Sequence, residues 1–212
     1  MGYLVPGRVH RVEEIVRRSR FIGTIAPAPD PEAAHAFIRS VQREMPDATH
    51  HCWAFVAGPP GNTAHVGLSD AGEPHGTAGR PILNSLLHSG VGEIVAVVTR
   101  YFGGVKLGKG GLGRAYASAV TGALETLPTT RRVPLVTVVI EAHHAAVGPI
   151  CRALDILGAS EREETFQATA RVEIRARVPE AGVPTLRSEV GRITKGEGKV
   201  ELAGAGSMER AE

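Results

Sequence analysis

Apolar positions recur most regularly near the middle of the chain. At intervals of three and four residues the sequence places Leu112, Ala115, Tyr116, Ala119, Val120, Ala123, Leu124 and Leu127. This spacing puts the side chains on one face of a helix, so it predicts a long helix packed on one side. The preceding run EIVAVVT (93–99) is almost continuously apolar. It predicts a central strand that is covered on both faces.

The elements before this run follow shorter patterns. Two strand-like runs between residues 8 and 26 predict a hairpin. Residues 30–45 predict a helix, with Asp30 as N-cap, Pro31 in the first turn and Pro46 beyond its end. THHCWAFVAG (49–58) is expected to be a strand. HVGLSDAGEPHGTAG (65–79) is expected to be a loop, and a second helix follows from residues 77–81 to Gly90.

The pattern restarts after a predicted linker at residues 128–134. Strand and helix patterns then follow in the order βαββαβ. Within the segment TARVEIRARV (169–178), apolar and polar residues alternate strictly, as in a half-buried strand. That order is typical of a ferredoxin-like domain. We therefore expect an α+β fold with one domain over residues 1–130, a ferredoxin-like domain over 131–205 and a tail over 206–212.

Composition narrows the class of protein only slightly. The 212 residues carry a net charge of +2, too small to argue nucleic-acid binding alone. Residues 1–130 hold 12 Lys/Arg against 10 Asp/Glu and the remainder 12 against 12, so the basic excess lies in the first part. The two cysteines are far apart, and no apolar run is long enough to span a membrane. We expect a soluble cytoplasmic protein, with a sequence compatible with a monomer.

The segment RYFGGVKLGKGGLGRAY (100–116) concentrates glycines and cations directly before the long helix. Helix N-termini present free N–H groups and the positive end of a dipole, and these bind anions. Tight turns and close helix–sheet packing are the structural alternative. The residues that we expect to contact phosphate or nucleic acid are Arg100, Tyr101, Gly103, Gly104, Lys106, Gly108, Lys109, Gly110, Gly111 and Arg114.

Two nucleotide-binding motifs match this segment incompletely. Gly103, Gly108 and Lys109 satisfy G-x-x-x-x-G-K, but Gly110 stands where a P-loop needs a hydroxyl for magnesium. The G-x-G-x-x-G pattern ending at Gly113 lacks the acidic residue about 20 positions further on. We therefore predict no nucleotide cofactor.

Three segments together resemble the YigZ/IMPACT family: HHCWAF (50–55), SDAGEPHGTAGRPIL (69–83) and TRYFGGVKLGKGGLGRAY (99–116). The resemblance covers nearly the whole chain. It implies a first domain with the α/β fold of a small-subunit ribosomal protein domain shared with GHMP-type kinases. It implies a second domain like the ferredoxin-like domains of elongation factor G. Eukaryotic relatives regulate translation, and bacterial members are suspected of contacting nucleic acid or the ribosome.

The chain departs from the family motifs at four positions. Ala71 replaces a usual Asp, His75 a Ser or Ala, Lys109 a Thr and Gly113 a Val. The loss of an acid and the gain of a lysine make the expected surface more basic. They also weaken any mechanism that needs two adjacent carboxylates or the threonine hydroxyl.

A second group of candidates comes from the loop and the strand before it: His51, Asp70, Glu73, His75, Thr77 and Arg80. Asp70 and Glu73 could act as acid and base in a cleft. Alternatively, Glu73 and Thr77 cap the following helix and Asp70 starts a turn. Neighbouring strand residues such as His51 and Cys52 point to opposite faces, so we predict no metal site there.

The first hypothesis is a non-enzymatic, translation-associated regulatory or binding protein. Its basic glycine-rich surface would contact RNA, the ribosome or an acidic protein partner. The alternative is an enzyme acting on a small phosphorylated or nucleotide ligand between SDAGEPHGTAG and the glycine-rich segment. A protein-interaction module without nucleic acid is the third possibility.

Overall fold

The computed structural model describes residues 2–167 and 169–203. The described chain divides into two compact units, one formed by Tyr3–Arg132 and the other by Gly2 with residues 133–167 and 169–203. Both units combine helices with antiparallel sheets, so the predicted α+β fold is confirmed. The predicted tail, residues 206–212, lies outside the described residues.

The first unit is built on a five-stranded antiparallel sheet with the order β2-β3-β6-β4-β5. The strands are β2 (His10–Val16), β3 (Ser19–Pro27), β4 (His50–Val56), β5 (Val66–Ser69) and β6 (Ile94–Tyr101). The apolar run chosen as a central strand is indeed β6, at the centre of the sheet and buried except at its last residue.

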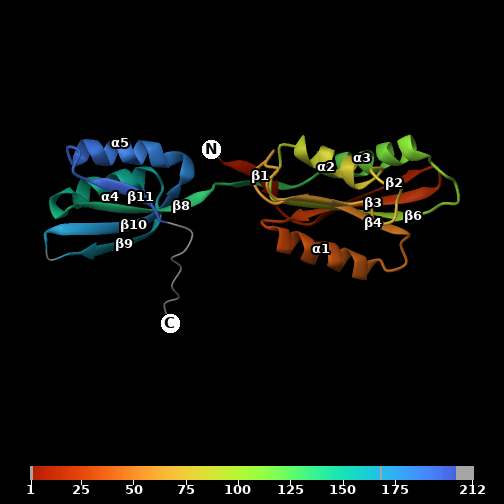
Figure 1. Cartoon of the computed structure of the whole chain (residues 1–212), viewed down its shortest axis with the longest axis horizontal. Coiled ribbons are helices and arrows are strands. Elements are labelled where there is room, and N and C mark those ends of the chain that lie inside the picture. The colour runs from red at the N-terminus through yellow and green to blue at the C-terminus, as the bar shows by residue number, and fades with distance from the viewer. Residues whose placement is uncertain (1, 168, 204–212) are drawn as a thin grey trace. The chain divides into compact units, whose positions relative to one another are not determined.

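Helices cover both faces of this sheet (Figure 1). α1 (Pro31–Glu44) lies on one face, and α2 (Gly79–Leu87) and α3 (Lys109–Glu125) lie on the other. α1 begins as predicted, since the Asp30 side chain accepts a hydrogen bond from the Ala33 N–H group. The apolar stripe of α3 from Leu112 to Ala123 is buried against the sheet, which confirms the predicted packing.

Two short segments differ from the prediction. β1 (Tyr3–Pro6) pairs with β7 (Thr129–Arg132), so most of the expected linker is a strand. All four residues of β7 are exposed, and a polar strand of this length carries no apolar alternation to reveal it. β5 lies inside the expected loop, as a four-residue edge strand.

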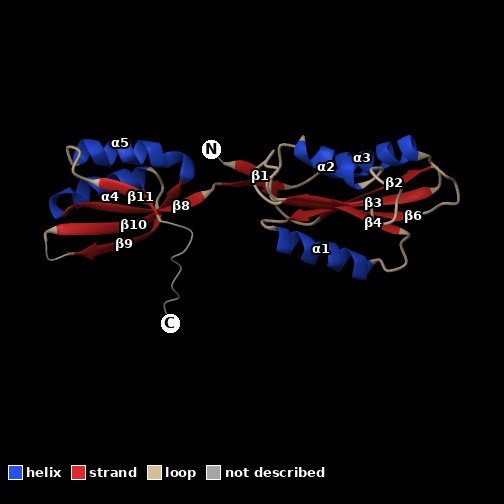
Figure 2. Ribbon diagram, in the orientation of Figure 1, coloured by secondary structure: helices blue, strands red, loops and turns tan. Residues whose placement is uncertain are grey.

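The second unit has a four-stranded antiparallel sheet with the order β11-β8-β10-β9 (Figure 2). Its elements follow the predicted order β8 (Leu135–His143), α4 (Val147–Ile156), β9 (Ser160–Phe166), β10 (Arg171–Pro179), α5 (Val183–Ile193) and β11 (Lys199–Leu202), with short 3₁₀ turns at His144–Ala146 and Glu180–Gly182. Sequence order and sheet order are those of a ferredoxin-like domain. None of the helices in the described residues combines the length and hydrophobicity that a bilayer span requires.

Candidate phosphate-binding site

The N-terminus of α3 is open. Gly108 precedes the helix with φ 73°, in the left-handed region that favours glycine, and no side chain caps the helix. Its first turn contains no acidic residue. Leu112 donates to the Gly108 carbonyl, but across residues 2–167 and 169–203 the N–H groups of Lys109, Gly110 and Gly111 have no partner. Three donors at the positive end of a 17-residue helix are therefore available to an anion.

Free cations surround this helix end. Lys106, Lys109 and Arg114 are exposed, and none forms an ion pair or hydrogen bond with any other described residue. Arg17, in the turn between β2 and β3, is also exposed and unpaired within the described chain. Arg17 was not predicted from the sequence, because this residue lies far from α3 in the chain. The pairing of β2 with β3 brings its turn to the start of α3.

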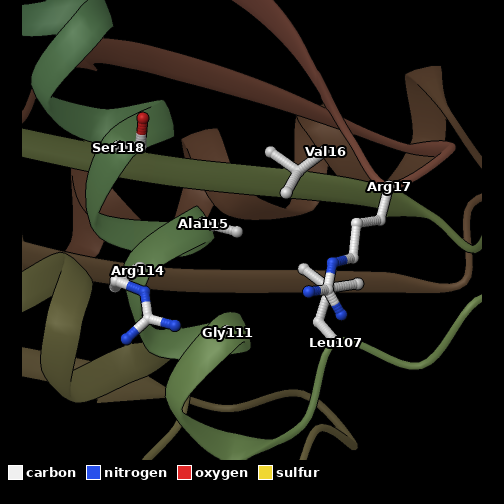
Figure 3. Close-up of a pocket in the computed structure, with 7 residues that line it drawn as sticks. All are labelled: Val16, Arg17, Leu107, Gly111, Arg114, Ala115 and Ser118. Carbon is white, nitrogen blue, oxygen red and sulfur yellow. The ribbon is translucent and has the colours of Figure 1, made fainter.

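Arg17 and Arg114 line one hollow of about 270 Å³ (Figure 3). Arg17 extends from the hairpin and Arg114 projects from α3 beside Gly111. Leu107, Val16 and Ala115 supply apolar parts of the wall. The hollow therefore places two guanidinium groups near the open helix end.

A second, larger cavity of about 500 Å³ also borders this segment and shares Leu107 with the hollow. Its apolar lining consists of Pro74, Phe102, Leu107 and Leu112. Its polar and backbone lining consists of Thr49, His50, Glu73, Arg100, Lys106, Gly108 and Lys109. The cavity thus combines apolar walls with a few convergent polar groups, as ligand sites commonly do.

Arg100 has a different setting from the surface cation that the sequence led us to expect. Its side chain is only 6% exposed, and its guanidinium forms an ion pair with Glu73 and donates to the Ser19 hydroxyl. It also lies over the rings of Phe21 and Phe102, each 5.4 Å away. A side chain on Gly103 would collide with the Arg18 carbonyl, so this glycine lets the segment after β6 pass close to the hairpin.

Glu73 is the acceptor at the centre of the buried cluster. The Tyr116 hydroxyl donates to the same carboxylate oxygen, at 2.8 Å, as the Arg100 guanidinium does. Burial, with Cys52 and Glu73 nearby, raises the pKa of Tyr116. Burial also raises the pKa of Cys52 to about 12, so this thiol is not an activated nucleophile at neutral pH. His50 Nε2 lies 3.9 Å from the carboxylate oxygen of Glu73.

Asp70, and not Glu73, holds the start of α2. Its carboxylate accepts hydrogen bonds from the N–H groups of Gly76, Ala78 and Gly79. Burial acts to raise the pKa of Asp70, but these hydrogen bonds stabilise the charged carboxylate and the pKa is lowered from its ordinary value. Thr77 donates to the Pro74 carbonyl instead of capping the helix. The expectation that Glu73 and Thr77 cap α2 is therefore wrong, because the Glu73 carboxylate accepts from Arg100 and Tyr116 instead of from the first turn of α2.

The remaining candidates lie elsewhere. Tyr101 and His51 point to the face of the sheet that α1 covers, because neighbouring strand residues point to opposite faces. On that face the Tyr101 hydroxyl donates to the Asp47 carboxylate, and the His51 Nε2 lies within hydrogen-bond distance of the Met45 carbonyl. His75 is fully exposed, 3.7 Å from Asp70, and Arg80 is exposed near the start of α2.

Gly104, a predicted phosphate contact, and Ala71, a departure from the family motif, both have a left-handed backbone conformation, with φ of 80° and 43° respectively. At Ala71 the methyl side chain makes this conformation costly.

Comparisons with known proteins give one family. The model of the Impact N-terminal domain matches residues 17–124. The chain is 41% identical over 195 residues to IMPACT family member YigZ of Escherichia coli (strain K12), covering 92% of this chain and 95% of that protein. It is 36% identical over 182 residues to the IMPACT family member in pol 5'region of Thermus thermophilus, covering 86% of this chain and 97% of that one.

A solved crystal structure, described as that of a hypothetical protein, is 40% identical with a TM-score of 0.68 and covers 95% of this chain and 97% of its own. The resemblance carried by the three sequence motifs is therefore confirmed, and the chain belongs to the IMPACT family.

Proposed function

We propose that this chain is a non-enzymatic, translation-associated binding protein that works in the cytoplasm and contacts the phosphates of structured RNA, including ribosomal RNA. The RNA backbone lies across the first turn of α3. Membership of the IMPACT family supports the translational context, because the family resemblance implies it.

One observation carries the proposal: the open N-terminus of α3 is flanked by cations that have no partner in the described chain. An unpaired lysine or arginine gives up little when it binds phosphate, because it breaks no internal ion pair. Lys106 and Lys109 border the larger cavity and Arg114 borders the smaller hollow, and Leu107 lines both. Successive phosphates of one strand can therefore meet the cations of both the cavity and the hollow.

The test uses purified protein and a fluorescently labelled RNA hairpin in an anisotropy titration at low salt. The Lys106→Ala and Arg114→Ala variants should each bind more weakly. Lys199→Ala, in β11 of the second unit, should bind like the wild type. Co-migration of the wild type with ribosomal particles in a low-salt gradient, sensitive to nuclease, is the corresponding expectation in lysate. Failure to bind either RNA or particles at low salt would reject the proposal, and nuclease-resistant capture would favour an acidic protein partner.

A second function has its own supporting observation. The larger cavity is lined both by the buried Glu73–Arg100 pair and by two free lysines, an arrangement in which a small phosphorylated or nucleotide ligand could react. Thermal-shift screening against nucleotides and phosphorylated metabolites tests this alternative. A saturable shift with turnover, where Glu73→Gln removes turnover but not the shift, would favour an enzyme.

A further inference from the structure

We infer that the larger cavity receives one unstacked nucleotide, with its phosphate at the start of α3 and its base against Phe102. The inference rests on the proposed function, and it names the class of RNA that the site prefers: RNA with an unpaired nucleotide, and not a continuous duplex.

The phosphate end of the cavity is defined by Lys106, Gly108 and Lys109. Both lysines line the cavity and are unpaired within the described residues. The free N–H groups of the first turn of α3 begin at the same place. A phosphate there would receive backbone hydrogen bonds and the charge of two ammonium groups, the combination used at helix N-termini that bind phosphate.

The base end is defined by Phe102. This large aromatic side chain is 47% exposed. One face of its ring lies over the Arg100 guanidinium, so the ring is held in place from within. Leu107, Leu112 and Pro74 complete an apolar wall. Unpaired bases in RNA are commonly bound by stacking on such an aromatic ring.

The buried carboxylate in the cavity does not oppose an anion. Glu73 is paired with Arg100 and accepts a second hydrogen bond from Tyr116, so its charge is already compensated. The two lysines then give the lining a net positive charge. The Arg100 side chain is buried, and its Nε has no partner in the described chain. The cavity therefore borders a polar side chain whose hydrogen-bonding capacity is incompletely used.

The size of the cavity agrees with one nucleotide. Its volume of about 500 Å³ falls in the range of sites for small molecules and is too small for a duplex. A base held in a helix has both faces stacked and cannot reach Phe102. Recognition of a nucleotide in a bulge, in a loop or at a free end follows from this geometry.

The experiment compares three probes by calorimetric titration: an RNA hairpin with a single-nucleotide bulge, the same hairpin fully paired, and free nucleoside monophosphates. The wild type should bind the bulged hairpin more tightly than the paired one. Phe102→Ala should weaken binding of the bulged hairpin roughly 5- to 150-fold, corresponding to one stacked base, and leave the paired hairpin nearly unaffected. Phe102→Trp should retain the preference. Circular dichroism checks that each variant is folded.

The outcomes separate this inference from the proposed function. Equal wild-type affinity for the two hairpins, or equal weakening of both by Phe102→Ala, would overturn the nucleotide site while leaving phosphate binding intact. Binding of a free monophosphate without binding of either hairpin would keep the cavity assignment and reject RNA as the partner. No binding of any probe would overturn both.

Discussion

Glu73 and Arg100 form an ion pair inside the first unit, with side chains only 4% and 6% exposed. They come from different parts of the sequence, the loop before α2 and the end of β6, and both line the larger cavity. The ion pair holds the loop against the sheet. The Tyr116 hydroxyl, from α3, donates to the same carboxylate. It thus joins the three elements that surround the candidate site.

The first prediction concerns the stability of this pair. Arg100→Met leaves a buried carboxylate without its partner, so the free energy of unfolding should fall by about 3–5 kcal/mol. Urea denaturation followed by the fluorescence of Trp53, the single tryptophan, reports on the first unit. The double variant Glu73→Leu/Arg100→Met should lose clearly less than the sum of the two single changes. Strict additivity would mean that the two side chains are not coupled.

The second prediction concerns Asp70. Asp70→Ala removes the acceptor of three N–H groups at the start of α2, and should lower the free energy of unfolding by about 0.5–2 kcal/mol at pH 7. Since the pKa of Asp70 is lowered in the folded state, its contribution is complete above the ordinary value of 3.8 and is lost as pH falls through the lower folded value.

The difference between wild type and Asp70→Ala should therefore shrink in acid. Asp70→Asn is the matched control, because it keeps an acceptor but has no charge to titrate. A wild-type advantage over Asp70→Ala that stays constant down to pH 2 would contradict this account of the cap.

The third prediction concerns the thiols. Cys52 is fully buried with a pKa raised to about 12, so it should be unreactive toward a disulfide reagent at pH 8. A Cys151→Ser variant leaves Cys52 as its single thiol. The native variant should release no coloured thiolate from the reagent, and the variant unfolded in urea should release one equivalent per chain. Rapid reaction of the native variant would show that the cluster around Glu73 opens to solvent.

The long periodic helix, the central strand and the ferredoxin-like order were predictable from the sequence, because apolar spacing alone determines which faces are buried. The Glu73–Arg100 pair was not, since nothing local indicates that a strand-end arginine points inward. Arg17 was missed for the same reason: only the pairing of β2 with β3 and the packing of α3 bring its turn to Gly111. Side-chain partners separated by 27 residues or more depend on tertiary packing, which periodicity does not encode.

The fourth prediction separates stability from binding at the helix N-terminus. Gly110 lies in the first turn of α3, and a side chain there would make only an ordinary contact with Arg114. Gly110→Ala should raise the free energy of unfolding by up to about 1 kcal/mol through helix propensity, and it keeps the main-chain N–H group that binds the phosphate. Gly110→Glu should also stabilise the helix, through the dipole, yet weaken RNA binding because it puts a carboxylate at the phosphate position. Equal binding by both variants would place the anion elsewhere.

The central claim is that phosphates bind at the start of α3 through Lys106, Lys109 and Arg114. Its most direct test is the slope of log K against log salt concentration for the labelled hairpin. The account predicts steep weakening with salt for the wild type. It predicts a slope reduced by about one in Lys106→Ala and in Arg114→Ala, and an unchanged slope in Lys199→Ala. The same slope in all four proteins, or affinity that does not depend on salt, would contradict it.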